Sequence, residues 1–230
     1  MDYLDLKTRI QTRLARSNTD LVNSIPQWIN EKQQEIVNYR DWWFLRVLKQ
    51  ASLTAGQTVY SLPTDYKSDA ILYILRTGAN NSKVSYDKLE MKSFEDALKY
   101  YLPDDTGEPE TWILGKNSFS VRPIPDKAYI VRFSYYQYLV PLVNDGDTNI
   151  LLTEYPQVVL AGVLAEGFAY LQETQDALYW EKKYANYLHD LEVKDTDRKL
   201  PSEFALSPRQ DYFGNTLSSS KPRAGSDEYF

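Results

Sequence analysis

The chain has 230 residues, 43% of them hydrophobic and 25% charged, so it can bury a core and is too apolar to be disordered throughout. It contains no cysteine and a single histidine, which excludes disulfides, thiolate chemistry and multi-histidine metal centres. The net charge of -6 disfavours an extended phosphate-binding surface, so no direct nucleic-acid binding is expected. The 19 tyrosines, 5 tryptophans and 8 phenylalanines are a content typical of contact surfaces.

The N-terminal part of the chain has a helical pattern. Its apolar residues recur at spacings of three and four and predict a helix from residue 2 to about 16; they are Tyr3, Leu6, Ile10 and Leu14. A capping box that starts at Ser24 predicts a second helix from there to about residue 40, after a short polar loop over 17–23. We therefore expect residues 1–41 to form a helical hairpin.

The next segment, 42–148, consists of short β-branched and aromatic runs separated by Gly, Pro and Asn, which indicates antiparallel strands. The predicted strands cover residues 58–62, 70–76, 84–86, 111–114, 119–122 and 129–139. Residues 115–118 are expected to join two of them as a hairpin loop.

One short helix is expected within this β-rich insertion. Ser93 and Asp96 fit its first turn, and Pro103 fits its end. Its predicted apolar face consists of Phe94, Leu98 and Tyr101.

Residues 149–195 are expected to form a second helical hairpin that packs on the N-terminal helices. Thr153 is a candidate N-cap for a helix to about Glu173, and Thr174 for another to about Val193. The first of these helices is rich in small residues, which allow another backbone to approach closely. They are Ala161, Gly162, Ala165, Gly167 and Ala169.

Beyond these helices, residues 196–230 lose periodicity and read as an extended C-terminal tail. Its aromatic residues are candidate anchors for a partner: Phe204, Tyr212, Phe213, Tyr229 and Phe230. Fully extended, the tail spans roughly 110 Å. The expected fold class is thus α+β, with a helical bundle from the N- and C-terminal helices, an inserted antiparallel β-rich region and this tail.

A second candidate surface is the basic flank of the first helix, formed by Arg9, Arg13 and Arg16. This flank could bind an acidic partner. Asp5 lies four residues before Arg9, however, so a partly self-paired, exposed face is an equally good interpretation.

Candidate reaction centres are weak. Asp145, Asp147 and Asn149 match the opening of a calcium loop, but Ile150 and Pro156 occupy the positions of its glycine and bidentate glutamate, which favours an ordinary turn. The carboxylates of Asp104, Asp105 and Glu108 could serve glycoside hydrolysis, yet clustered acids beside Pro and Gly are usually a solvated loop. His189 is expected on the surface near a helix end.

Two aromatic clusters could stack on sugars: residues 42–44, and Tyr135 and Tyr136 with Tyr138. Core packing is the favoured interpretation of both clusters. The sequence has no P-loop, GxGxxG, GxSxG or HExxH motif. We expect no catalytic residue, no cofactor and no metal. We also expect no membrane span, since the longest apolar stretches are far shorter than the roughly 20 residues that one requires. No export signal is visible, which favours synthesis in the cytoplasm.

The order of several apolar motifs resembles the head-to-tail adaptor proteins of tailed bacteriophages. The resemblance covers most of residues 1–194 and rests on order and spacing. It begins with Tyr60-Ser61-Leu62-Pro63, Asp65-Tyr66, Phe119-x-Val121-x-Pro123-x-Pro125 and Tyr135-Tyr136. It continues with Asn149-x-Leu151-Leu152-x-x-Tyr155-Pro156, Leu160, Leu164-Ala165-Glu166, Tyr170-Leu171, Ala177, Trp180 and Tyr184.

The resemblance implies a non-enzymatic virion protein, made in the host cytoplasm and located in the neck between capsid and tail. It implies a homo-oligomeric ring, usually of twelve copies, that contacts the portal protein and a tail nozzle or stopper protein. DNA would pass through the ring without sequence-specific binding. Two alternatives stay open: a carbohydrate-binding or glycan-cleaving tail component, and another neck protein such as a stopper or tail-completion protein.

Overall fold

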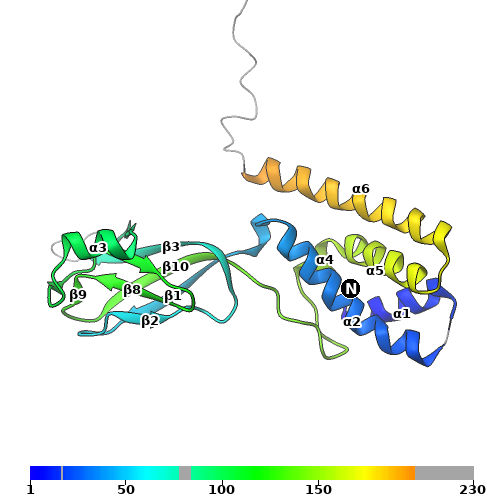
Figure 1. Cartoon of the computed structure of the whole chain (residues 1–230), viewed down its shortest axis with the longest axis horizontal. Coiled ribbons are helices and arrows are strands. Elements are labelled where there is room, and N and C mark those ends of the chain that lie inside the picture. Colours follow the sequence, from blue (N-terminus) through cyan, green and yellow to red (C-terminus); the bar gives the residue numbers. More distant parts are fainter. Residues whose placement is uncertain (17, 78–83, 200–230) are drawn as a thin grey trace, which may run out of the picture.

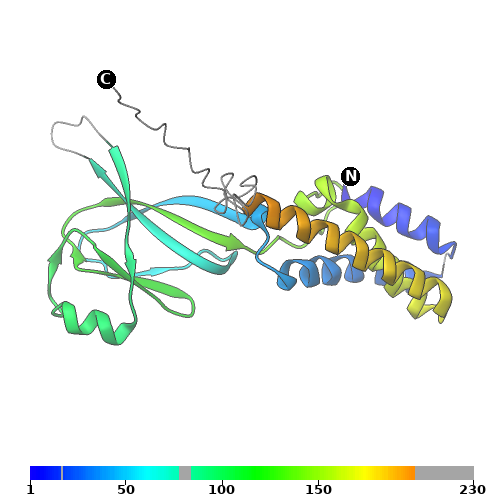
Figure 2. The same ribbon diagram turned by 90° about the horizontal axis from the view of Figure 1, so that it is seen from above.

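A computed structural model describes residues 1–16, 18–77 and 84–199. In this part of the chain the fold is α+β, with six α-helices, a short 3-10 helix and ten strands. The molecule is elongated, with α1, α2, α4, α5 and α6 at one end and the sheets, together with α3, at the other (Figure 1). A view from above shows the same separation (Figure 2).

The first two helices are α1, Tyr3–Leu14, and α2, Thr19–Tyr39. Helix α2 begins before Ser24, so the predicted capping box is wrong. The Asn18 side chain accepts a hydrogen bond from the Asp20 amide and caps the helix, whereas the Ser24 hydroxyl donates to the Asp20 carbonyl inside it. The earlier start also places Leu21 in the core, fully buried.

The larger sheet has the strand order β1-β10-β3-β4, and every neighbouring pair is antiparallel. Its strands are β1, Arg46–Leu53; β10, Tyr129–Gln137; β3, Tyr66–Thr77; and β4, Val84–Lys88. Strand β1 was not predicted. Its side chains from Leu48 to Ser52 are all exposed, so it has no apolar-polar alternation, and its pairing with β10 defines it. The 3-10 helix η1, Trp43–Leu45, leads into it.

The smaller sheet has the order β2-β8-β7-β5. Its strands are β2, Val59–Ser61; β8, Ser118–Arg122; β7, Thr111–Leu114; and β5, Glu90–Met91. The predicted hairpin between β7 and β8 is confirmed, with the Gly115 amide bonded to the Ser118 carbonyl. The predicted strands pair antiparallel with one another. Parallel pairs occur where two-residue strands take part: β5 with β7, and β6, Thr106–Gly107, with β9, Ile124–Pro125.

The short helix α3, Phe94–Tyr100, begins as predicted. The Ser93 hydroxyl accepts a hydrogen bond from the Asp96 amide. The predicted apolar face is wrong at Phe94, which is 64% exposed, because the helix packs through the small side chain of Ala97.

The C-terminal helices are α4, Ile150–Glu154; α5, Pro156–Tyr170; and α6, Thr174–Lys199. The prediction that Thr153 is an N-cap is wrong. Asn149 caps α4, and Pro156 then occupies the first turn of α5, where its missing N–H costs nothing. Helix α6 continues past Val193 to Lys199, so residues 196–199 are helical although the sequence placed them in the tail.

The protein has two hydrophobic clusters. One lies among the helices and includes Leu6, Ile29 and Leu164, and the other lies between the two sheets and includes Trp112 and Phe133. In the first cluster α5 contacts α1, α2 and α6. Two of the small residues predicted in α5 permit this close packing of the helices. A Cβ atom at Gly167 would meet the Leu14 side chain at 2.9 Å, and one at Gly162 would meet Lys32 at 2.7 Å.

Candidate functional site

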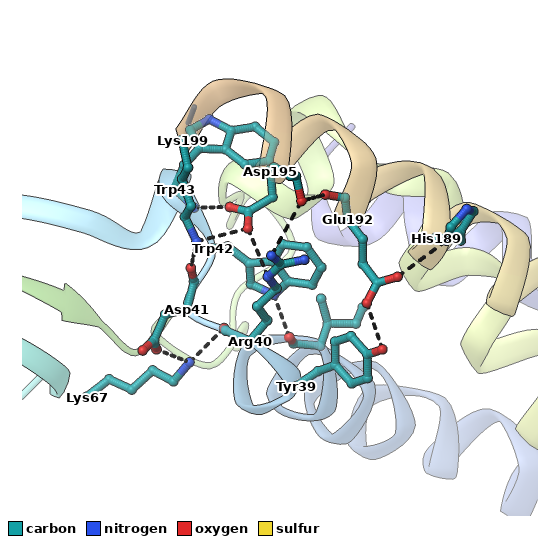
Figure 3. A network of polar contacts seen from close by, with 12 residues as sticks. Tyr39, Arg40, Asp41, Trp42, Trp43, Lys67, His189, Glu192, Asp195 and Lys199 are labelled. Atoms are coloured by element: carbon teal, nitrogen blue, oxygen red, sulfur yellow. Dashed lines mark hydrogen bonds and ion pairs between the residues drawn. The ribbon is translucent and has the colours of Figure 1, made fainter. Parts of the chain in front are cut away.

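The helices and the sheets meet at a polar network at the C-terminal end of α6 (Figure 3). The network combines side chains from the end of α2, the start of β3 and the last turns of α6 with the backbone amide of Trp43 in η1. It is the place from which the chain continues into residues 200–230, and we refer to it as the junction.

Asp195 is the central acid of the junction and is 0% exposed. Its carboxylate accepts the backbone amide of Trp43 at 2.7 Å and pairs with Arg40 Nε at 3.0 Å and Lys199 Nζ at 2.9 Å. A buried carboxylate is stable only when such partners replace water. Asp195 therefore joins the end of α2, η1 and the last turn of α6 at one point.

Lys67, in β3, is the second centre of the junction. Its ammonium donates to the carbonyls of Val37 and Arg40 at 2.6 and 2.8 Å, and it lies 2.8 Å from the Asp41 carboxylate. The last carbonyls of a helix lack partners within the helix, so this ammonium caps α2. Burial acts to raise the pKa of Asp41, but hydrogen bonds from Lys67 and Ser68 outweigh it and lower the pKa.

A more exposed part of the junction joins α2 and α6. The Tyr39 hydroxyl donates to Glu192 at 2.7 Å, and this hydrogen bond to a carboxylate raises the pKa of Tyr39. His189 Nδ1 lies 3.4 Å from Glu192, and the imidazole is mostly exposed. The expected surface position of His189 is confirmed, although α6 extends well beyond it.

Most of the aromatic residues in the two clusters are used in packing, as the sequence favoured, but Tyr138 is 38% exposed. Trp42 is fully buried, its indole donates to the Ile36 carbonyl at 2.7 Å, and its ring stacks on Phe44 at 6.0 Å. Tyr135 is also fully buried and donates to Asp65 at 2.7 Å. These rings present no face to a sugar. Tyr136, by contrast, is half-buried beneath the guanidinium of Arg46 at 4.9 Å.

The predicted basic flank is occupied by contacts within the chain. Arg9 pairs with Asp5 at 2.9 Å, and Arg16 pairs with Glu173 at 3.1 Å. Arg13 lies over the Trp180 ring at 5.2 Å. Arg9 thus pairs within α1, Arg13 links α1 to α6, and Arg16 links the end of α1 to the α5–α6 turn. Whether they also bind a partner stays a prediction.

Four of the carboxylates singled out by the sequence are engaged in contacts within the chain, and Asp104 is exposed. Asp105 accepts the Leu102 amide at 2.7 Å, and Glu108 pairs with Arg76. Asp147 accepts the amides of Val143 and Asn144, which confirms an acidic turn. Asp145 pairs with Lys7 of α1 at 2.6 Å. Across residues 1–16, 18–77 and 84–199, no group of three His, Asp or Glu side chains is placed to hold a metal ion.

Sequence reasoning missed the central residues of the junction: Asp195, Asp41 and Lys67. A signal was present for Asp195, because it follows Leu191 by four residues and continues the apolar stripe of α6. A charged residue on such a stripe requires buried partners. The tail aromatics Phe204, Tyr212, Phe213, Tyr229 and Phe230 lie outside the described residues.

Large apolar side chains are exposed at both ends of the molecule. At the helical end they surround the α5–α6 turn and comprise Tyr170, Leu178 and Tyr179. At the sheet end they surround α3 and comprise Met91, Phe94, Tyr100 and Leu102. Val140 and Val143, in the connection between β10 and α4, are exposed as well. Such side chains indicate a contact surface where they lie together. None of the helices in the described ranges has the length and apolar character needed to cross a bilayer.

An elongated subunit with a buried ionic junction and apolar side chains exposed at both ends is typical of proteins that function through assembly. The comparison with protein families identifies the class of assembly protein. The model of the SU10 adaptor protein family matches residues 1–207, so the chain belongs to this family of phage head-to-tail adaptors. The resemblance seen in the sequence is thus confirmed. Membership implies a structural component of the virion neck that associates with other neck proteins. No curated protein shows significant similarity to the chain.

Proposed function

We propose that this adaptor forms a ring of about twelve copies between the portal and the tail, around the channel through which DNA passes. The observation that carries the proposal is the exposure of large apolar side chains near the α5–α6 turn, such as Tyr179, and in α3, such as Tyr100. These two elements lie at opposite ends of the subunit (Figure 1). A closed ring requires two different surfaces on each copy, one for each neighbour.

Charge and the tail support the same role. The net charge of -6 suits a channel wall, because like charge repels phosphate and prevents DNA from adhering. The aromatic residues beyond the family match suit docking onto the portal, a neighbouring copy, or a nozzle or stopper protein. They are Tyr212, Phe213, Tyr229 and Phe230.

The mass of the full chain in solution, alone and with purified portal, tests the proposal. We expect a ring-sized species in at least the portal-bound sample. Leu178→Ser combined with Tyr179→Ser should leave subunits that bind without closing a ring, since both side chains are exposed and neither supports the core. The matched control is Glu181→Ser on the same helix, also exposed, which should leave the ring intact.

A chain that stays monomeric with portal, and that is missing from the neck in images of the virion, would contradict the proposal. A ring that binds another neck protein but never the portal would instead assign it to a stopper or tail-completion role. Ring formation by the double-serine variant would exclude the α5–α6 turn as a lateral surface.

A further inference from the structure

In the described ranges, the outer face of the larger sheet is exposed at Leu48, Gln50 and Ser52. The inner face, with Val131, Phe133 and Tyr135, belongs to the core between the sheets. On the outer face a hollow of about 360 Å³ is lined by Arg46, Leu48, Tyr73, Tyr86, Arg132 and Ser134, among others. Leu48 lies opposite Ser134 and Arg132 opposite Tyr73 in the strand register, so these residues share one face. Leu48 is 54% exposed.

The hollow combines apolar surface with an available positive charge. The guanidinium of Arg132 lies 4.0 Å from the centre of the Tyr86 ring. Within the described ranges, no carboxylate comes within ion-pair distance of Arg132. Arg46 is already paired with Asp69 and bonded to Ser134. The site therefore suits a segment that carries an apolar side chain next to an acidic one.

Helix α6 ends beside this face. The ammonium of Lys199, the last described residue, lies 5.7 Å from the centre of the Tyr136 ring, over which Arg46 also lies. Tyr136 is two residues from Ser134 along β10 and points to the same side of the sheet. The chain thus leaves the helix next to the hollow.

The residues that follow have the required chemistry. The sequence from 200 is Leu-Pro-Ser-Glu-Phe-Ala-Leu, with Glu203 directly before Phe204. In extended conformation the five residue steps from Lys199 to Phe204 span about 16 Å. The four residue steps along β10 from Tyr136 to Arg132 span about 13 Å. The family match also continues past α6 and ends at residue 207, so this segment belongs to the family pattern.

We propose that residues 200–206 dock on the outer face of the larger sheet of their own subunit. Phe204 occupies the hollow beside Leu48 and Tyr73, and Glu203 pairs with Arg132 at its rim. The sequence predicts Phe204 as an anchor for a partner, whereas in this proposal it binds its own subunit. The segment that carries the four later aromatic residues then begins at a fixed position on that subunit. The inference does not depend on ring formation.

Because the chain has no cysteine, an engineered pair tests the docking without background. Gln50 is exposed on the outer face, opposite Arg132. We combine Gln50→Cys with Ala205→Cys, because this pair leaves Leu48 and Phe204 unchanged. The matched control is Lys49→Cys with Ala205→Cys, since Lys49 is exposed on the same strand and points to the opposite face.

We expect a disulfide within single chains of the Gln50 pair, formed roughly tenfold faster than in the Lys49 pair, which corresponds to a docking preference of about 1.4 kcal/mol. Adding Phe204→Ser should reduce the rate to that of the control while leaving the unfolding temperature of the body unchanged. Equal rates in the two pairs, or no effect of Phe204→Ser, would overturn the proposal. Disulfide-linked dimers in place of monomers would show that a second copy supplies the segment.

Discussion

The carboxylate of Asp195 accepts a hydrogen bond from the backbone amide of Trp43 at 2.7 Å, across 152 positions of sequence. This contact fixes the last turns of α6 to the 3-10 helix that leads into β1. Because the same carboxylate pairs with Arg40 and Lys199, one side chain sets where the helical part of the subunit continues into the sheets and where the tail begins.

The first prediction concerns the charge of Asp195. Asp195→Asn keeps the acceptor for the Trp43 amide but removes the negative charge between two cations. We expect unfolding in urea to require about 2–3 kcal/mol less free energy, a loss moderated because both cations are partly exposed. Asp190→Asn, on the exposed side of the same helix, should change stability by less than about 0.5 kcal/mol. Equal stability of the two variants would show that the junction charge is unimportant.

The second prediction concerns acid. The pKa of Asp41 lies below its ordinary value of 3.8 in the folded protein, so its ionised form stabilises the fold at pH values above 3.8. That contribution is lost as the pH falls through the folded-state pKa. Asp41→Asn should therefore lower stability at neutral pH and flatten the dependence of unfolding free energy on pH below about 4.

Denaturant titrations at several pH values measure this effect. Asp104→Asn is the control, because Asp104 is exposed and takes part in no ion pair within the described residues. Its curve should run parallel to that of the unmodified chain. An Asp41→Asn curve that is equally steep in acid would assign the acid sensitivity to other carboxylates, such as Asp65, whose pKa is also lowered.

The third prediction concerns the cap supplied by β3. Lys67→Met retains the aliphatic stem but leaves the carbonyls of Val37 and Arg40 and the carboxylate of Asp41 without their donor. We expect a loss of about 2–3 kcal/mol and faster hydrogen exchange in the last turn of α2. Lys116→Met, in the exposed β7–β8 hairpin, should leave both quantities unchanged.

The fourth prediction concerns helix packing. Alanine at Gly167 gains about 1 kcal/mol of helix propensity, but its Cβ would lie 2.9 Å from the buried Leu14 side chain. Overpacking costs about 1–3 kcal/mol, so we expect Gly167→Ala to be neutral to destabilising despite its propensity. The direct measurement is a double-mutant cycle with Leu14→Ala.

In that cycle, Leu14→Ala alone should cost about 2–5 kcal/mol through the cavity it creates. The cost should be smaller in the Gly167→Ala background, because the added methyl group partly fills that cavity. Strict additivity of the two substitutions would show that α1 moves away from α5 freely.

Much of the fold was predictable where a pattern reports burial directly. The apolar stripe of α1 and the two glycines of α5 correspond to observed packing. Strand β1 could not be predicted, because its side chains from Leu48 to Ser52 are all exposed and its pairing with β10 defines it as a strand. The start of α2 was missed because Asn18 and Ser24 are both acceptable caps, and burial of Leu21 decides between them.

The junction was beyond local patterns for a different reason. Asp41 and Lys67 are ordinary surface residue types, and only the fold brings them within 2.8 Å. Buried Asp195 gave a signal through its position on the apolar stripe, but its partners Arg40 and Trp43 come from the opposite end of the chain. The helical spacing of apolar residues indicates that Asp195 is buried and needs partners, but it does not identify those partners.

The hydrogen bonds from Lys67 to the end of α2 have a mechanical consequence. A rigid connection between a long helix and a long strand makes the subunit a lever: turning the helical end by a few degrees displaces the far tip of the sheets. In the proposed ring, a copy could not shift its contact with one neighbour without tilting toward the other neighbour. Ring closure would then be cooperative, and strain at one subunit interface would be distributed over all the interfaces of the ring.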